Sequence, residues 1–226
     1  MVLHVIDALE AAREIEGVVL CGPDKAAVDQ EKELRLCVDS NRVRWLESQT
    51  TPSSSTYHAM QSLSDSTPVL VTTADHALLT EEMVDYFCSG ARKSNKDVVV
   101  GLALHDLITS TYPQTKRTAI QLADGSYCSC NLFGFLTPEA RGAARFWRKV
   151  ESQRKKTLRV IAGFGWLNLL LYLVKPPSLE EGLGRASQRL GLTVGAVVMP
   201  FPEAAVDVDT VSDWKLVESI LANRTA

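Results

Sequence analysis

One transition from strand to helix constrains this chain more than any other feature, because it places a carboxylate at the edge of a buried sheet. Residues 67–80 read Thr-Pro-Val-Leu-Val-Thr-Thr-Ala-Asp-His-Ala-Leu-Leu-Thr. The apolar run predicts a buried parallel strand, and Thr80 followed by two acids predicts a capped helix. Asp75 thus follows a strand end, where open α/β sheets bind ligands. The Asp75 carboxylate is a suitable ligand for Mg²⁺ that also binds substrate phosphates. The alternative is that Asp75 is a loop residue that caps the next helix.

The composition is that of one globular α/β domain. The 226 residues suffice for a full core, and the hydrophobic content of 46% and charged content of 23% are ordinary. The net charge of −3 provides no positive field for a phosphate backbone, so no nucleic-acid partner is expected. The start shows no signal-peptide pattern and the five cysteines suit reduced thiols, so we expect a cytoplasmic protein.

Strand and helix patterns alternate along most of the chain. This alternation favours a mainly parallel Rossmann-like sheet flanked by helices. Residues 41–47 are ambiguous, and 106–116 read as a loop. The predicted helices cover residues 2–14, 24–33, 56–64, 81–94, 179–190 and 211–221, and the predicted strands cover 17–23, 34–38, 97–104 and 193–199.

A β-hairpin is predicted between residues 118 and 136, because Asp-Gly separates two strand-like runs. A hairpin at the ligand edge is expected to shape the acceptor side of a pocket. Lys116 and Arg117 at its base are candidates for an acceptor phosphate, and a solvated pair of charges is the alternative. Cys128 and Cys130 alternate on this strand, but zinc would need two more soft ligands.

Residues 137–191 are predicted to form a helical insertion, opened by Thr137 as N-cap and Pro138. Within it, residues 160–174 are the most apolar stretch of the chain. Its length of about fifteen residues falls short of the roughly 20 that cross a bilayer. Two interpretations remain: a helix buried against the sheet, or an interfacial helix that touches a membrane surface weakly or covers an apolar acceptor.

Two further groups of polar residues can complete a site with Asp75. Asp207 and Asp209 lie on one face of an extended segment. If the fold brings them to Asp75, the three carboxylates could hold Mg²⁺ against a nucleotide triphosphate. Residues 50–55, predicted as a loop before a helix, offer hydroxyls to a base, ribose or phosphate, with ordinary N-capping as the alternative.

Residues 71–80 and 206–214 together resemble the MobA-like NTP transferase family, whose members are GT-A-type nucleotidyltransferases. The resemblance spans most of the chain and implies one GT-A-type domain over residues 1–226. It assigns Asp75 as the metal aspartate. It also aligns the run Asp-x-Asp-Thr-x-x-Asp, which starts at Asp207, with the motif before the family's last helix.

The same resemblance implies roles for residues outside these two motifs. Ser53, Ser54 and Ser55 match the segment that contacts the nucleotide base, and Thr73 lies in the strand-end motif on the nucleotide side. Asn131 matches the asparagine of a strand that faces the acceptor. The implied partners are therefore an NTP and a phosphorylated small-molecule acceptor.

The implied reaction is transfer of NMP from an NTP to the acceptor, with release of pyrophosphate. Asp75 and Asp209, with Asp207 in reserve, would hold Mg²⁺, and Lys116 or Arg117 would neutralise phosphate charge. Two alternatives stay open. A GT-A glycosyltransferase would use the same aspartates with a nucleotide sugar, and a non-catalytic remnant would bind a nucleotide without turnover.

The chain departs from the family pattern at its start. Relatives open with a strand and a loop that reads roughly Leu-Ala-Gly-Gly-x-x-x-Arg-x-Gly, followed by a phosphate-binding lysine. Residue 1 aligns instead with the helix that follows this loop. Because the family's first strand is central, residues 17–22 are expected to lack one pairing partner. A start codon assigned too far downstream, a truncated gene and a degenerate binding protein each explain this departure.

Overall fold

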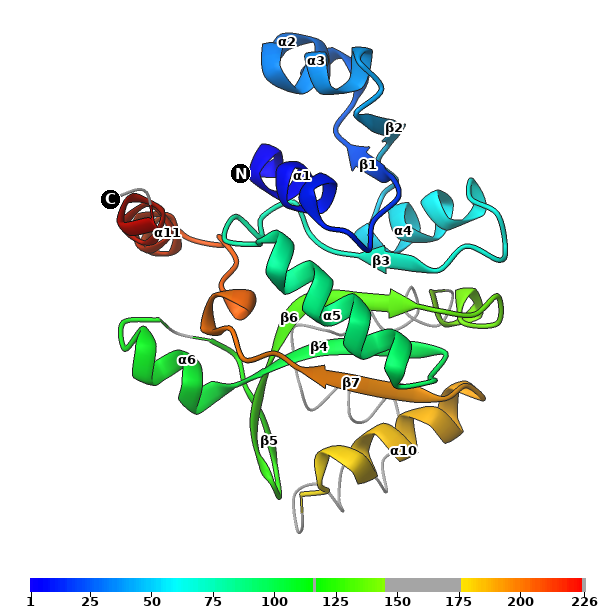
Figure 1. Cartoon of the computed structure of the whole chain (residues 1–226), viewed down its shortest axis with the longest axis vertical. Coiled ribbons are helices and arrows are strands. Elements are labelled where there is room, and N and C mark those ends of the chain that lie inside the picture. The colour runs from blue at the N-terminus through cyan, green and yellow to red at the C-terminus, as the bar shows by residue number, and fades with distance from the viewer. Residues whose placement is uncertain (116, 145–175, 225–226) are drawn as a thin grey trace.

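The computed structural model of the 226-residue chain describes residues 1–115, 117–144 and 176–224. Helices and strands alternate through these residues, as the sequence predicts (Figure 1). The helices are α1 (Val2–Ala11), α2 (Lys25–Gln30), α3 (Lys32–Asp39), α4 (Pro52–Gln61), α5 (Glu81–Lys93), α6 (His105–Thr111), α10 (Leu179–Leu190), the 3-10 helix η1 (Pro202–Ala205) and α11 (Val211–Arg224). The strands are β1 (Val18–Gly22), β2 (Val43–Glu47), β3 (Val69–Val71), β4 (Val98–Leu104), β5 (Ile120–Leu122), β6 (Gly125–Phe135) and β7 (Val194–Val198).

The larger sheet has the strand order β3-β6-β4-β7, and β5 pairs with β6. β4 and β7 are parallel, whereas β6 is antiparallel to both β3 and β4. The three strands β3, β4 and β7 therefore point the same way, with one reversed strand between them. β1 and β2 form a separate parallel pair, in which β1 has no second partner within the described residues. The predicted α/β fold with a largely parallel sheet flanked by helices is confirmed.

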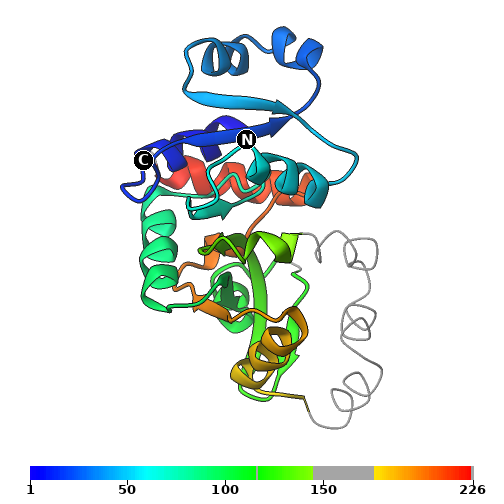
Figure 2. The ribbon, with the colours of Figure 1, turned by 90° about the vertical axis from the view of Figure 1, so that its right-hand side faces the viewer.

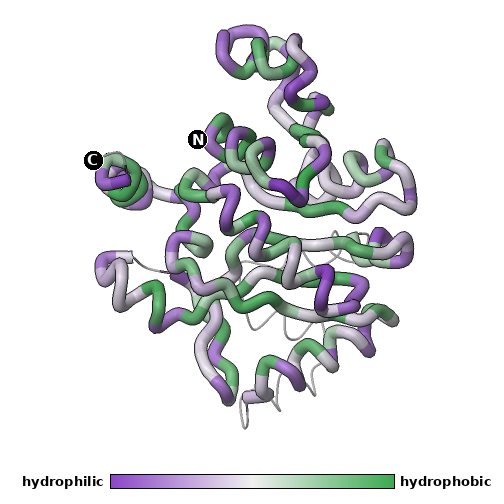
Figure 3. The backbone as a smooth tube through the Cα atoms, in the orientation of Figure 1, coloured by the Kyte–Doolittle hydropathy of each residue, from purple (hydrophilic) through white to green (hydrophobic). Residues whose placement is uncertain are grey.

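Helices cover both faces of the larger sheet. Figure 2 shows α5 and α10 on opposite sides of it. On the α5 side, Phe87 is buried in the main core with the strand residues Val99 and Leu132. On the other side, residues of α10 pack near Val98 and Phe135. Hydrophobic residues follow much of β3 and β7 (Figure 3), in keeping with strands covered by helices.

Helix α1 connects the two sheets. Val5 and Ala8 belong to the main core, whereas Ile6 belongs to the core beneath β1 and β2. Residues on neighbouring faces of one short helix therefore serve two different cores. β1 pairs only with β2 in the described residues, so packing of α1 and contacts with α4, among them the hydrogen bond from Arg44 to the Ser62 carbonyl, hold this pair to the rest of the molecule.

The predicted hairpin is confirmed. β5 and β6 pair antiparallel, and Leu122 lies opposite Gly125 across a tight turn. Gly125 has a φ of 150°, which favours glycine at this position. β6 then runs on between β3 and β4, so the second strand of the hairpin is a central strand of the sheet.

Five local predictions are wrong. The helix predicted over residues 24–33 is divided at Glu31, where α2 ends and α3 begins. Residues 34–38 form a helix rather than a strand, because Leu34 and Cys37 face the core three residues apart, the spacing of a helical face. Residues 106–116 include most of α6 instead of a plain loop. The stretch 50–55 enters helix α4 at Pro52, with Thr51 as N-cap, and α1 ends at Ala11 rather than at residue 14.

Only the two ends of the predicted insertion 137–191 lie within the described residues. Thr137 Oγ1 accepts a hydrogen bond from the Ala140 amide, as expected of an N-cap. Ser178 and Glu181 form a capping box at the start of α10, which ends at Gly191 with a φ of 66°. The apolar residues 160–174 and Lys116 lie outside the described residues. Among the helices that are described, none has the length and apolar character to cross a membrane.

Candidate functional site

The turn that holds Asp75 lies between β3 and α5, as predicted. The backbone turns back on itself, with the His76 amide donating to the Thr73 carbonyl and the Ala77 amide to the Asp75 carbonyl. Asp75 Oδ1 and Thr73 Oγ1 are both buried, and neither has a hydrogen-bond partner in the described part of the chain. A buried oxygen without a donor costs about 1–3 kcal/mol, so such groups commonly bind an ion or a ligand.

His76 leaves the charge of Asp75 without a neutralising partner. Its ring is buried, and Nδ1 lies 3.4 Å from Thr72 Oγ1. Burial lowers the pKa of His76 to about 4, although the Asp75 carboxylate acts in the opposite direction. The imidazole is therefore neutral at pH 7 and does not form an ion pair with Asp75. This turn can accept a cation.

The fold brings the two predicted aspartate motifs together. The Val208 amide donates to the Asp75 carbonyl over 3.2 Å. Val208 lies between Asp207 and Asp209, and consecutive Cα atoms are about 3.8 Å apart. The Cα atoms of Asp207 and Asp209 therefore lie one residue on either side of the backbone contact with Asp75. Helix η1 precedes this segment and α11 follows it.

Asp207 is held by two side chains from the hairpin. Arg117 Nη1 forms an ion pair with Asp207 Oδ1, and Nη2 donates to the Asp207 carbonyl over 2.7 Å. Asn131 Nδ2 donates to the other carboxylate oxygen, Oδ2, over 3.0 Å. Arg117 also lies 3.3 Å from Asp213 Oδ1. The side chain of Arg117 is only 10% exposed, so this is a nearly buried polar cluster.

The three carboxylates thus differ in what they can offer to a cation. Asp209 is exposed and has no side-chain partner among the described residues. Asp75 has a buried free oxygen, and Asp207 has both oxygens engaged. Residues 1–115, 117–144 and 176–224 contain no group of three or more His, Cys, Asp and Glu residues that could hold a metal. Two carboxylates completed by substrate phosphates and water fit the coordination habit of Mg²⁺.

Asn131 has an unusual backbone that directs it to this cluster. Its φ is 50°, a conformation that is uncommon outside glycine. Val100 pairs with Phe133 and Leu102 with Ser129, so three residues of β6 lie opposite Gly101 alone. Such a bulge redirects a side chain from the regular alternation of a strand. The sequence predicts Asn131 as an acceptor-side residue but gives no sign of the bulge.

A cavity of about 200 Å³ lies beside this cluster. Its lining is mostly polar and comes from the hairpin and from the segment before α11. The residues are Arg117, Thr118, Cys128, Ser129, Asn131, Ala205, Asp207 and Asp209. Burial raises the pKa of the Cys128 thiol, so this sulfur is a neutral group of the wall. The cavity can accommodate a small polar group next to Asp209.

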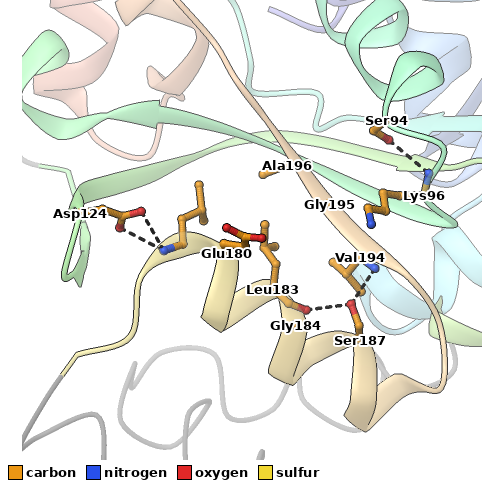
Figure 4. A pocket seen from close by; sticks show the side chains of 11 residues that line it. Ser94, Lys96, Asp124, Glu180, Leu183, Gly184, Ser187, Val194, Gly195 and Ala196 are labelled. Atoms are coloured by element: carbon orange, nitrogen blue, oxygen red, sulfur yellow. Dashed lines mark hydrogen bonds between the residues drawn. The ribbon is translucent and has the colours of Figure 1, made fainter.

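A larger cavity of about 520 Å³ lies elsewhere, between β7 and α10 (Figure 4). Lys96, Asp124 and Glu180 are among its charged residues, and none of the predicted site residues lines it. Both carboxylate oxygens of Asp124 accept from the Leu179 amide at the start of α10. Asp124 thus serves the start of the helix, and the predicted site residues lie elsewhere, so we assign the site to the smaller cavity, which Asp207 and Asp209 line.

The predicted base-side serines lie in the first turn of α4. Ser53 and Ser55 are buried. Ser55 Oγ accepts from the Gln49 amide over 2.8 Å and donates to the Thr51 carbonyl, and the Ser54 amide donates to Thr51 Oγ1. These bonds are those of a capped helix start. A nucleotide-binding role of Ser53, Ser54 and Ser55 stays a prediction.

Asp213 is a site residue to which the sequence analysis gave no role. Its Oδ2 accepts from the amide and hydroxyl of Thr210 over 2.9 and 2.7 Å, and its Oδ1 faces Arg117. The spacing Thr210-x-x-Asp213 is that of a reciprocal helix cap and could have indicated the local part of this role. The pairing with Arg117 joins residues far apart in the sequence, so no local pattern reveals it.

Comparisons with solved structures show the fold of nucleotidyltransferases. A hypothetical transferase from Thermus thermophilus is 29% identical, with a TM-score of 0.74 over 94% of this chain and 85% of that chain. The 4-diphosphocytidyl-2C-methyl-D-erythritol synthase of Anaerococcus prevotii is 14% identical, with a TM-score of 0.58 over 98% of this chain and 86% of that chain. The 2-C-methyl-D-erythritol 4-phosphate cytidylyltransferase of Thermus thermophilus is 15% identical, with a TM-score of 0.57 over 98% of this chain and 89% of that chain.

A comparison with curated proteins gave no match. A comparison with family models matched residues 1–114 to the MobA-like NTP transferase domain. This half of the chain includes the turn at Asp75 and the serines of α4. The chain therefore belongs to the MobA-like NTP transferase family.

Proposed function

We propose that this protein is a nucleotidyltransferase that transfers NMP from an NTP to a phosphorylated small-molecule acceptor. The observation that carries this proposal is the buried oxygen of Asp75, which has no hydrogen-bond partner among the described residues and lies next to the segment that bears Asp209. A buried oxygen without a hydrogen-bond donor destabilises the fold, so its presence indicates that a ligand binds there. Membership in an NTP transferase family makes a nucleotide with its metal ion the best candidate.

Asp75 and Asp209 are the residues that would hold Mg²⁺. The ion would neutralise phosphate charge while the nucleotide is bound. The neutral imidazole of His76 leaves the Asp75 carboxylate free for this role at pH 7. No side-chain nucleophile is needed, because an oxygen of the acceptor phosphate attacks the α-phosphorus. The bond from that phosphorus to the bridging oxygen of the β-phosphate breaks, and pyrophosphate leaves.

The acceptor group is proposed to enter the cavity of about 200 Å³. Thr118 and Ser129 offer hydroxyl donors there, next to Asp209. The charge of Arg117 is already shared between Asp207 and Asp213, so Lys116 is the remaining candidate from the hairpin base for contact with an acceptor phosphate. Holding the acceptor beside the nucleotide would supply most of the catalysis, as is usual for positioned phosphoryl transfer.

The direct test is release of pyrophosphate from each of the four common NTPs, supplied with Mg²⁺ and a panel of phosphorylated acceptors. We expect release with one preferred nucleotide, and its loss in Asp209→Asn. Release of a nucleoside diphosphate from a nucleotide sugar would instead identify a glycosyltransferase. Thermal stabilisation by nucleotide without turnover in any combination would identify a binding protein.

A further inference from the structure

Asp207 differs from the other motif aspartates because the protein itself uses both of its carboxylate oxygens. Oδ1 pairs with Arg117 and Oδ2 accepts from Asn131. We propose that Arg117 and Asn131 are positioning residues. They hold residues 207–213 so that Asp209 faces the cation of Asp75, and Asp207 is not a ligand of that cation. The cation itself is part of the proposed function, on which this inference rests.

The charges around Arg117 support this assignment. One guanidinium, 10% exposed, lies between the carboxylates of Asp207 and Asp213, which are 23% and 15% exposed. A divalent cation bound to Asp207 would lie next to the positive charge of Arg117. Neighbouring like charges repel strongly where water is scarce. Arg117 thus directs a cation away from Asp207 and toward the two carboxylates that it does not touch.

The backbone geometry shows how the cluster fixes the segment before α11. Arg117 Nη2 binds the Asp207 carbonyl, and the Val208 amide binds the Asp75 carbonyl. Asp213, on the far side of Arg117, also caps the start of α11 through Thr210. The segment is therefore held at both ends, and Asp209 is an exposed carboxylate between these attachments.

Asn131 contributes from a backbone conformation that has no evident value to the sheet. A φ of 50° in the bulge of β6 lies in the left-handed region, which asparagine adopts more readily than most other non-glycine residues. The bulge is possible because Gly101 lies opposite, where a Cβ would be only 3.0 Å from Leu132 Cβ. The gain from this arrangement is the hydrogen bond from Asn131 to Asp207.

Hydrogen exchange of the metal-free, full-length chain tests the positioning. In Arg117→Gln and Asp207→Asn we expect backbone amides of residues 207–213 to exchange at least about tenfold faster than in the wild type. Asp209→Asn should leave the exchange unchanged. Arg42→Gln is the matched control, since Arg42 also pairs with two acids, Asp7 and Glu10, on another surface. Unchanged exchange in Arg117→Gln would overturn the proposal.

Binding of Mn²⁺, followed by electron paramagnetic resonance, tests the assignment of ligands. Asp209→Asn should weaken Mn²⁺ binding about 100-fold and leave the amide hydrogen exchange of residues 207–213 at the wild-type rate. Asp207→Asn and Arg117→Gln should weaken Mn²⁺ binding only about tenfold, but these variants should show the faster amide exchange. Arg117→Lys should restore part of both properties. Equal losses in Asp207→Asn and Asp209→Asn without faster exchange would make Asp207 a direct ligand and overturn the proposal. Absence of Mn²⁺ binding by the wild type would overturn the proposed function and the role of Asp209. In that case, the amide hydrogen exchange of Arg117→Gln would still show whether Arg117 positions residues 207–213.

Discussion

At the scale of single residues, Asp75 combines burial with a missing partner. Its Oδ1 is buried without a donor among the described residues, and its neighbour His76 is neutral at pH 7. Such an arrangement favours ligand binding over stability, because the fold bears the cost of desolvating the carboxylate. Asp75 should therefore matter much more to activity than to folding.

Asp75→Asn tests this expectation. We predict that pyrophosphate release falls at least about 100-fold, because one of two cation ligands is lost. The free energy of unfolding should stay the same or rise by up to about 1 kcal/mol, because a buried charge is removed. Denaturation by guanidinium measures the second effect, with Asp39→Asn as an exposed control. A loss of more than about 2 kcal/mol would show that Asp75 has a structural role.

The sequence predicted the residues of the site better than it predicted their partners. Asp75 follows from the end of an apolar strand, and the motif at 207–213 from its spacing of acids. The ion pair of Arg117 with Asp207 could not be derived, because it joins the hairpin to a segment 90 residues later. Side-chain partners of this kind depend on the whole fold.

At the scale of elements, one carboxylate joins the starts of two strands. Asp97 precedes β4, and its Oδ2 accepts from the amide and the hydroxyl of Thr193, just before β7, each over 2.7 Å. Its Oδ1 accepts from Thr137 Oγ1 over 2.9 Å, just after β6. The hydrogen bonds from the Thr193 backbone, the Thr193 hydroxyl and Thr137 lower the pKa of Asp97 below its usual value.

A depressed pKa gives this contact a defined dependence on pH. The ionised form is favoured in the folded state, so its stabilisation is present above the unfolded pKa of Asp97 and is lost as pH falls through the folded pKa. Asp97→Ala should lower the free energy of unfolding by about 1.5–3 kcal/mol at pH 7. The difference from the wild type should shrink below about pH 5. A difference that is constant from pH 7 to the acid transition would contradict this account.

Two glycines test how closely the helices pack. A Cβ on Gly90 of α5 would lie 2.9 Å from Val197 Cγ2 of β7, whereas a Cβ on Gly182 of α10 would have no atom of the described residues within 4 Å. We expect Gly90→Ala to lower the free energy of unfolding by about 1–2 kcal/mol through steric conflict. Gly182→Ala should raise it by about 0.5–1 kcal/mol, because alanine favours a helix. Thermal and chemical denaturation of both variants would check the opposite signs.

The elements with the clearest apolar pattern are the ones that the sequence predicted well. Helix α5 has a clear apolar period and the N-cap Thr80, and strands β4 and β7 are almost continuous apolar runs. Helix α3 was less predictable, because only Leu34 and Cys37 face the core, and residues 34–38 also fit a strand pattern. Two buried residues define a face too weakly to distinguish the helical period from the strand period.

At the scale of the whole molecule, the site depends on segments from three parts of the chain. The turn after β3, the hairpin of β5 and β6 and the segment before α11 meet around Asp207 and Asp75. The antiparallel course of β6 between β3 and β4 makes this meeting possible. The alternation of strands and helices predicted a parallel sheet, but it held no information on which strand β6 would pair with.

Because the site joins these distant segments, its ligands should stabilise the whole fold. We predict that the preferred NTP with Mg²⁺ raises the free energy of unfolding by about 2.7 kcal/mol at 100 times its Kd. Removal of the metal with EDTA should abolish most of the effect. In Asp209→Asn the nucleotide should give little stabilisation. An equal thermal shift with and without Mg²⁺ would contradict a cation held by Asp75 and Asp209.

Anomalous diffraction from crystals grown with Mn²⁺ and a non-hydrolysable NTP analogue tests the central claim most directly. The account predicts an anomalous peak about 2.0–2.3 Å from carboxylate oxygens of both Asp75 and Asp209, with the nucleotide phosphates as further ligands. The Asp207 carboxylate should remain bound to Arg117 and Asn131. A peak coordinated by Asp207, or a nucleotide bound in the cavity between β7 and α10, would contradict it.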